Sequence, residues 1–447
     1  MRKTREIQST IFDIIPDHLL GREYQAISKI LDQHPRILYW VAADLGSTKT
    51  KATGRRGLSA ETILRAAIVK QHHQFSYEEL SIHLHDSRTF SAFCRLAGTE
   101  PSKSALQEAI SSITASTWEK VNRAILVSAQ AQGIEMGRVV RTDATPVESE
   151  IHKPMDSELL WDVVRVLSRM MEAARESAPC LKFHNRTRAC KKRLLELRFH
   201  SRKANKKRRY REIIGYTQET MDAARQAITT VSKWDLTWSV WIAEAERILG
   251  LAEKVISQTR RRVLQGEAVP ANEKILSLFE DHTDLIVKGR QDVTYGHKVS
   301  LTTGKSGMVL DLVVEEGNPC DVTRAVPMIE RQIEIYGVAP KQCAFDGAYA
   351  SKANLEEIKA LGVKDVMFQK KRGLTIEEMT KSPWVYRKLR NFRAGVESVI
   401  SCLKRAFGLS RCSWKGWDHF QAYTWASAVS FNLATLGRKL VHRQATA

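Results

Sequence analysis

The sequence lacks the features that mark secreted, membrane-spanning and zinc-binding proteins. It has no run of 18 apolar residues, and its basic start (residues 1–5) leads into no signal-peptide core. Seven scattered cysteines include no Cys-x-x-Cys pair, which indicates reduced thiols in a cytosolic protein without membrane segments. Without a cysteine pair nearby, the histidines are predicted to lie on helix surfaces rather than to bind metal: His72, His73, His83 and His85.

Acidic residues are scarce relative to basic ones. The chain has 50 Asp and Glu against 70 Lys and Arg, which gives a formal net charge of +20. This balance favours a polyanionic partner, usually nucleic acid, but charge alone does not separate DNA from RNA. The length of 447 residues and the hydrophobic content of 43% predict two or three domains with real cores and exclude general disorder.

Helical patterns dominate the first 135 residues. Residues 1–55 predict a short helical arm that ends in a polar tether around 46–57. Residues 56–135 predict a domain of short helices, with capping boxes that begin at Ser76 and Ser104. Such helices fit a helix-turn-helix DNA reader, and they fit any small helical bundle about as well. The basic context favours the DNA-binding interpretation.

A second helical block is predicted at residues 156–288. Between Lys182 and Glu212 it carries fourteen Lys and Arg against two acids. A solvated helix face would account for such a run, but its density favours contact with DNA phosphates. The densest part of the run has four consecutive cations, predicted to bind DNA: Lys206, Lys207, Arg208 and Arg209.

The segments on either side of this block predict an α/β unit. A short extended run ends at Asp143, and later strands are separated by helices. These later strands are predicted at residues 293–301, 308–314, 342–346 and 366–368. The order is typical of a ribonuclease-H-like sheet. The predicted fold is therefore α/β mixed with α, with a catalytic core at 136–155 and 289–440, a basic helical insertion at 156–288 and an all-α N-terminal domain.

Three acids stand where such a sheet would collect ligands. Asp143 and Asp346 end strands that should be neighbours, and Glu397 is the only acid between Lys381 and Lys415. Taken alone, Glu397 fits a surface ion-pair network equally well. Three carboxylates at close range would not stay ionised without cations. Two Mg²⁺ or Mn²⁺ ions, roughly 3.5–4 Å apart, would hold them deprotonated and align a water or 3′-hydroxyl. We predict all three acids to be metal ligands and catalytic residues.

The residues around these acids form motifs of known type. The segments are Asp143-Ala-Thr-Pro-Val-Glu148 and Phe345-Asp346-Gly-Ala-Tyr-Ala350. They resemble the first and second aspartate motifs of bacterial insertion-sequence transposases of the DDE class, ISNCY type. Residues 57–107 resemble the N-terminal DNA-binding domain of these enzymes. The resemblance covers most of the chain beyond residue 55.

A third motif surrounds Glu397. Arg393-x3-Glu397-x6-Lys404 is similar to the family signature of Tyr, Arg, Glu and Lys at spacings 2, 3 and 6, and Arg390 stands at the Tyr position. The resemblance implies that the three acids bind the metals. It also implies that Arg393 and Lys404, on the same side of one helix, grip terminal DNA phosphates; Arg390 is a further candidate contact.

The resemblance implies a transposase that binds the terminal inverted repeats of an insertion sequence. One metal-dependent site would perform DNA strand cleavage and strand transfer. The expected partners are double-stranded DNA at the element ends and target, and a second copy of the chain, since two ends must be joined. The expected place of action is the bacterial cytoplasm, at the nucleoid. The alternative is an inactive, transposase-derived DNA-binding protein, against which the three intact acids argue.

Overall fold

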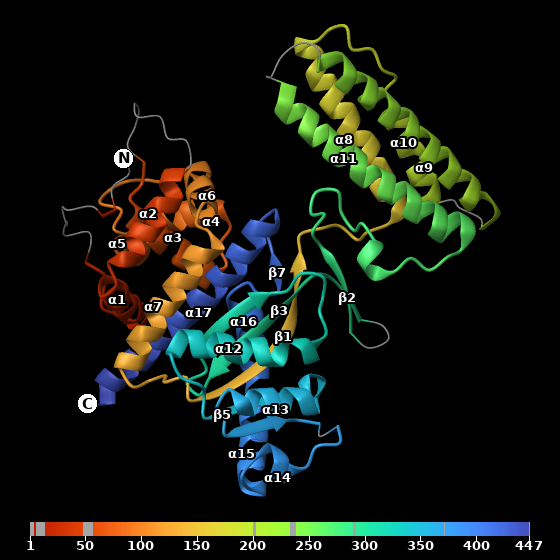
Figure 1. Cartoon of the computed structure of the whole chain (residues 1–447). Helices are drawn as coiled ribbons and strands as arrows, with labels where there is room; N and C mark the ends of the chain where they lie inside the picture. Colours follow the sequence, from red (N-terminus) through yellow and green to blue (C-terminus); the bar gives the residue numbers. More distant parts are fainter. Residues whose placement is uncertain are drawn as a thin grey trace. The chain divides into compact units, whose positions relative to one another are not determined.

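The computed structural model divides the chain into two compact units (Figure 1). It describes residues 4–5, 14–47, 57–199, 203–232, 238–288, 292–370 and 372–446. The first unit comprises residues 1–148 and 297–447, and the second comprises 149–296. Most of the predicted tether at 46–57 lies outside the described residues. None of the described helices is long and apolar enough to cross a lipid bilayer.

The N-terminal part of the first unit is helical throughout its described residues. Its helices are α1 (Leu19–Asp32), α2 (Arg36–Ser47), α3 (Ala60–His73), α4 (Tyr77–Asp86), α5 (Arg88–Cys94), α6 (Lys103–Ser111) and α7 (Ala115–Ala131). The capping box at Ser76 is confirmed at the start of α4. The box at Ser104 is wrong, because Ser102 caps α6 by accepting the amide N–H of Ala105 at 3.4 Å.

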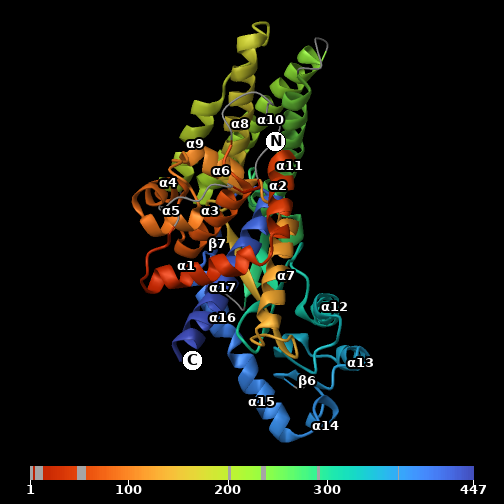
Figure 2. The same cartoon turned by 90° about the vertical axis from the view of Figure 1, so that its left-hand side faces the viewer.

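The C-terminal helix α17 (Trp417–Thr446) ties these helices to the rest of the unit. It packs against α1, α3 and α7, an arrangement that Figure 2 shows. Helix α3 is buried along both faces from Ala60 to Gln71, so it lies inside the unit and not on its surface. The N-terminal helices and the sheet therefore share one hydrophobic core.

A buried charge network fastens the start of α3. The Glu61 carboxylate is 2% exposed and accepts hydrogen bonds from Arg65 Nε at 3.1 Å and Arg5 Nε at 2.9 Å, and also from Arg95. Asp32 of α1 shares all three arginines. Two carboxylates thus pair with three guanidinium groups, which come from three separate segments of the chain.

The sheet has the strand order expected of a ribonuclease-H-like core. Its central order is β4–β3–β1–β5–β6, with parallel pairing of β1 with β5 and of β5 with β6, and antiparallel pairing of β3 with β4. The strands are β1 (Val139–Ser149), β3 (Asp292–Gly304), β4 (Val309–Val314), β5 (Gln342–Phe345), β6 (Asp365–Phe368) and the short β7 (Arg411–Cys412), which pairs with β1. Helices α12 (Ala325–Tyr336) and α13 (Lys352–Ala360) connect β4 to β5 and β5 to β6.

Two asparagines cover the backbone of the edge strand β4. Asn432 of α17 accepts the Val309 amide N–H at 2.8 Å and donates to Asn122 at 2.7 Å. Asn122 of α7 donates in turn to the Leu310 carbonyl at 3.3 Å. An open strand edge would invite pairing with another chain, and these side chains satisfy the edge inside the unit.

The second unit is a bundle of four helices followed by a hairpin. The helices are α8 (Asp156–Ser177), α9 (Thr187–Phe199), α10 (Lys203–Val231) and α11 (Ser239–Thr259), which continues into a π-helical turn at Arg260–Gln265. They enclose a separate apolar core. The hairpin joins β2 (Asp284–Lys288) to residues 292–296 of β3. The prediction of a helical insertion through residue 288 is wrong at its end, because residues 284–288 form strand β2.

The predicted surface histidines of α3 are instead packed among aromatic rings. The Tyr24 hydroxyl lies 3.2 Å from His72 Nδ1 and 3.0 Å from His73 Nε2. His72 also stacks on Phe407, with ring centroids 5.4 Å apart. Burial, and then the nearby His73 and Arg438, lower the pKa of His72 to about 3. Both histidines are half-buried and pack against aromatic rings, so the prediction that they lie on a helix surface is wrong for this pair.

We predict that Glu61→Gln destabilises the first unit severely. The change leaves three clustered arginines with Asp32 as their one carboxylate, and breaking a buried ion-pair network costs about 3–5 kcal/mol. Glu78→Gln removes an exposed pair with Lys103 and should cost less than about 1 kcal/mol. Urea unfolding of both variants measures the difference; equal losses would contradict the network's role.

A second prediction concerns acid stability. The folded-state pKa of His72 is about 3, below the ordinary 6.5, so below pH 6.5 the unfolded chain takes up a proton that the folded chain does not. Stability is therefore complete above pH 6.5 and falls as the pH drops toward 3. His72 should account for about 2 kcal/mol of loss between pH 7.5 and 5. His72→Phe should flatten this fall in urea unfolding, whereas His85→Gln, at an exposed position, should not.

Candidate active site

The three predicted carboxylates are carried by three separate elements. In the parallel pair β1–β5, Thr142 lies opposite Phe345, so Asp143 and Asp346 follow at the same level of the sheet. Glu397 lies in the first turn of α16 (Val396–Ala406), where the positive end of the helix dipole favours a carboxylate. The fold thereby brings Asp143 next to Arg393, which lies 250 positions further along the chain.

Arg393 is the point at which the three acids meet. Its Nη2 lies 2.9 Å from Asp143 Oδ2 and 3.7 Å from Asp346 Oδ1, and its Nη1 lies 3.1 Å from Glu397 Oε1. The Arg393 side chain is 10% exposed, whereas those of Asp143, Asp346 and Glu397 are 16%, 38% and 71% exposed. The site therefore opens from a buried guanidinium toward solvent on the Glu397 side.

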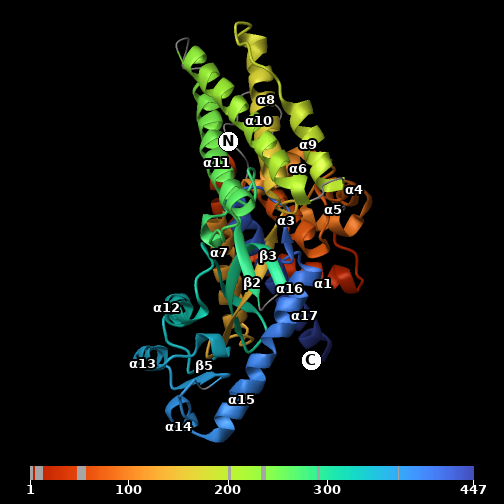
Figure 3. The same cartoon turned by 90° about the vertical axis from the view of Figure 1, so that its right-hand side faces the viewer.

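Arg393 and Lys404 do not lie on one continuous helix. Helix α15 (Pro383–Ala394) ends at Gly395 and α16 begins directly after it. Figure 3 labels the two helices one after the other along the chain. The prediction of a single helix is wrong here. Arg393 stands in the last turn of α15 and Lys404 in the last turn of α16. Arg390 is exposed on α15 and makes no ion pair with a described residue.

One site residue was not predicted from the sequence. Arg141, on β1, donates from Nε to the Thr303 hydroxyl at 2.8 Å and from Nη1 to the Phe392 carbonyl. Its guanidinium carbon lies 4.5 Å from the centroid of the Phe392 ring. The sequence signal was a charged residue inside a strand that is otherwise buried, two positions before Asp143.

Burial sets the charge states of two groups beside the acids. It lowers the pKa of Arg141, which still leaves a guanidinium charged at neutral pH. Burial also raises the pKa of Tyr349 well above its usual value, and the negative charges of Asp321 and Asp143 add to the shift. Tyr349 therefore remains a neutral phenol, and it cannot serve as an anionic ligand.

The donor set fits a hard divalent cation. Carboxylate oxygens are the ligands preferred by Mg²⁺ and Mn²⁺, and no cysteine or histidine is among the three acids. Among the described residues, no three His, Cys, Asp or Glu side chains form a ready metal-binding cluster, since the acids surround a guanidinium. Glu397 is exposed enough to turn from Arg393 toward a cation.

The predicted cation cluster in the second unit is partly engaged within its own bundle. Arg209 pairs with Glu196, Arg208 pairs with Glu212 at 3.1 Å, and Lys207 donates to the Leu264 carbonyl at 3.0 Å. Lys206 is exposed and makes no ion pair within the described part of the chain. Other exposed cations of α9 and α10 are also without such a pair: Arg188, Lys191 and Arg211.

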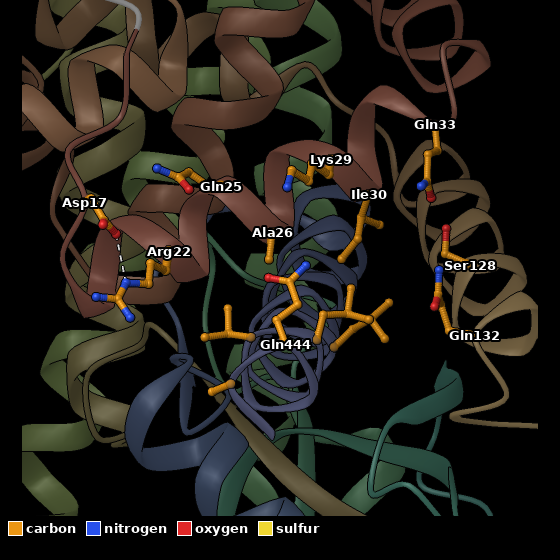
Figure 4. A pocket seen from close by; sticks show the side chains of 14 residues that line it. Asp17, Arg22, Gln25, Ala26, Lys29, Ile30, Gln33, Ser128, Gln132 and Gln444 are labelled. Carbon is orange, nitrogen blue, oxygen red and sulfur yellow. Dashed lines mark hydrogen bonds and ion pairs between the residues drawn. The ribbon is translucent and has the colours of Figure 1, made fainter. Parts of the chain in front are cut away.

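A sizeable hollow lies elsewhere in the first unit. A cavity of about 670 Å³ opens between α1, α7 and the end of α17, and Figure 4 shows its lining. Its polar lining is mainly amide, from Gln25, Gln33, Gln132 and Gln444. Its one carboxylate, Asp17, is paired with Arg22 at 2.8 Å. It offers no group of acids comparable to the one around Arg393.

Two known protein families match parts of this chain. The family described as "Transposase DDE domain" matches residues 286–433, which include Asp346 and Glu397. A second family, "Transposase domain (DUF772)", matches residues 11–111, the N-terminal helices. No match was found among curated proteins or solved structures. Together the two families cover more than half of the sequence, and the chain belongs to the DDE transposases of insertion sequences.

Proposed function

We propose that this transposase is an active enzyme whose chemistry is carried by Asp143, Asp346 and Glu397. It binds the terminal inverted repeats of its element, cleaves the DNA there and transfers the ends to target DNA. The observation that supports this is the convergence of three carboxylates, from β1, β5 and α16, on one guanidinium within 4 Å. An inactive descendant would be under no constraint to keep all three acids together.

The three carboxylates would hold two Mg²⁺ or Mn²⁺ ions, which supply an activated water or 3′-hydroxyl and stabilise the leaving oxygen. Asp143 and Asp346 come from the rigid sheet and fix the position of the site. Glu397, the most exposed of the three, completes it from the helix side. Arg393, Arg390 and Lys404 then offer cations to the phosphates next to the reacting bond.

The remaining regions would bind DNA without performing chemistry. We assign recognition of the terminal repeats to the helices between residues 56 and 135, and backbone contact to the basic bundle of the second unit. A homodimer is expected in the DNA complex because two element ends must be brought together. The proposed setting is the bacterial nucleoid.

Neutral replacements of the three acids should abolish strand cleavage and leave DNA binding intact. For Asp143→Asn, Asp346→Asn or Glu397→Gln, we expect the cleavage rate of element-end DNA to fall roughly 10³-fold, since metal ions contribute several kcal/mol to the transition state. Binding should be retained because it depends on cations elsewhere. Gel-based cleavage and fluorescence anisotropy measure the two effects.

Glu356→Gln is the matched control for the carboxylate variants. Glu356 is exposed on α13, and its replacement makes the same change of charge within the same unit. Cleavage should continue at the wild-type rate. Near-normal cleavage by Glu397→Gln, or equal losses in the control, would overturn the assignment of the site.

Phosphate binding by the second unit predicts a change in salt dependence. Changing Arg188, Lys191, Lys206 and Arg211 to Gln removes four exposed cations that pair with no acid among the described residues. For every DNA phosphate that these cations no longer neutralise, the slope of log affinity against log salt should fall by about 0.9, a total of roughly two to four. Affinity should fall alike for all duplex sequences.

The control removes cations that the bundle already neutralises. Arg225, Arg247 and Arg261 each bind two acids of the second unit. Changing these three to Gln should leave the salt slope nearly unchanged. If both variants flatten the slope equally, or neither does, the exposed cations are a solubility feature and do not bind phosphate.

A further inference from the structure

Arg141 links the strand that carries Asp143 to the joint that carries Glu397. On one side its Nε donates to the Thr303 hydroxyl of β3 at 2.8 Å, which ties the guanidinium to the neighbouring strand. On the other side Nη1 donates to the Phe392 carbonyl, at the end of α15. The guanidinium also covers the Phe392 ring, so the last turn of α15 is held by both a hydrogen bond and a cation–π contact.

Gly395, between α15 and α16, leaves the space that the Arg141 guanidinium occupies in this contact. Its φ of −68° and ψ of −8° are open to any residue, so the backbone conformation does not call for glycine. The constraint is space, because a Cβ at Gly395 would clash with Arg141 Nη1. A side chain at position 395 would therefore push the guanidinium away from the Phe392 carbonyl and ring that it contacts.

Burying Arg141 at this position costs folding stability. It is 7% exposed and has no carboxylate within ion-pair distance among the described residues. A buried charge without a counter-ion costs stability unless its hydrogen bonds are well satisfied. A lysine could not replace it, since one ammonium cannot stack on the ring and donate in two fixed directions as the planar guanidinium does. The hydrogen bonds and ring contact of Arg141 therefore fix where the last turn of α15 lies relative to β1.

We propose that Arg141 is a positioning residue that sets Glu397 relative to Asp143, with Gly395 as its required partner. Arg141 lies two residues before Asp143, and Phe392 lies five residues before Glu397, so the contact fixes the distance between the two acids. This inference rests on the proposed function of the three acids. Arg141 contacts Thr303 and Phe392, and its effect on Glu397 passes through the joint.

The test compares four variants of the full chain: Arg141→Lys, Gly395→Ala, Arg141→Met, and the double variant Arg141→Met with Gly395→Ala. Misplacing a catalytic group by about 1 Å costs roughly 10²-fold in rate, so both Arg141→Lys and Gly395→Ala should lower kcat for end cleavage by about that factor. KM and DNA affinity should change less than about two-fold. In the double variant the clash at position 395 is gone, so it should cleave as fast as Arg141→Met alone.

Hydrogen exchange gives a readout that does not depend on activity. Peptides spanning residues 392–400 should exchange faster in the Arg141 and Gly395 variants than in the wild type. The control is Arg331→Met, which breaks the pair of Arg331 with buried Asp311 and should destabilise the unit without affecting these peptides or kcat below the unfolding temperature. Because exchange needs neither metal nor DNA, it tests the joint even if no variant, wild type included, cleaves DNA.

Four outcomes would overturn the inference. The first is wild-type kcat in Arg141→Lys. The second is equal loss of kcat in Arg141→Met and Arg331→Met, which would indicate general destabilisation. The third is additive losses in the double variant, which would separate Gly395 from Arg141. Unchanged exchange at 392–400 would likewise exclude the joint as the route of the effect.

Discussion

The candidate active site depends on the contacts of the Arg393 guanidinium with three carboxylates. Three carboxylates within reach of one another repel strongly, and alone they would take up protons or move apart. A buried guanidinium with donors on two nitrogens lowers this cost, since each acid finds a charged hydrogen-bond or ion-pair partner. The three acids thus share one positively charged partner, at the place where the proposed divalent cations would bind.

Two kinds of structure hold this contact in place. The parallel register of β1 and β5 determines where Asp143 and Asp346 stand, and strand positions of this kind are rigid. The third acid depends on a helix joint, and a joint between helices is less strictly determined. Arg141 of β1 holds that joint through Phe392. Strand β1 therefore positions Asp143 directly and Glu397 through the joint. The edge of the sheet is in turn covered by Asn122 and Asn432, from helices far apart in the chain.

The parts of the site that the sequence predicted are those with a local signal. Asp143 ends a short extended run, Asp346 follows a short apolar run, and Glu397 is conspicuous among cations. The break at Gly395 has no such signal, because a glycine costs a helix only about 1 kcal/mol and apolar spacing continues on both sides. The contacts of Arg141 join residues that lie far apart in the chain, which no local pattern encodes. His72 was misassigned for the same reason, since its aromatic neighbours come from α1 and from beyond α16.

The order of the strands could be predicted from the sequence, whereas the predicted domain boundaries remain untested. The alternation of strands and helices after residue 289 indicated the order of the sheet, and capping at Ser76 was confirmed. Ser104 failed because Ser102, two residues earlier, offers the same cap. The β2 strand is only five residues long and is held by its antiparallel pairing with β3, so its own sequence shows little sign of it. The shared core of α3, α17 and the sheet rests on contacts between the two ends of the chain.

The central claim is that Asp143, Asp346 and Glu397 act together as one metal site on DNA. The most direct measurement is anomalous diffraction from crystals of the full chain grown with element-end DNA and Mn²⁺. The account predicts Mn²⁺ peaks within coordination distance, about 2.0–2.3 Å, of oxygens from all three acids, with the Arg393 guanidinium moved away from at least one of them. Mn²⁺ bound to other residues, with the three acids still paired to Arg393 beside bound DNA, would contradict it.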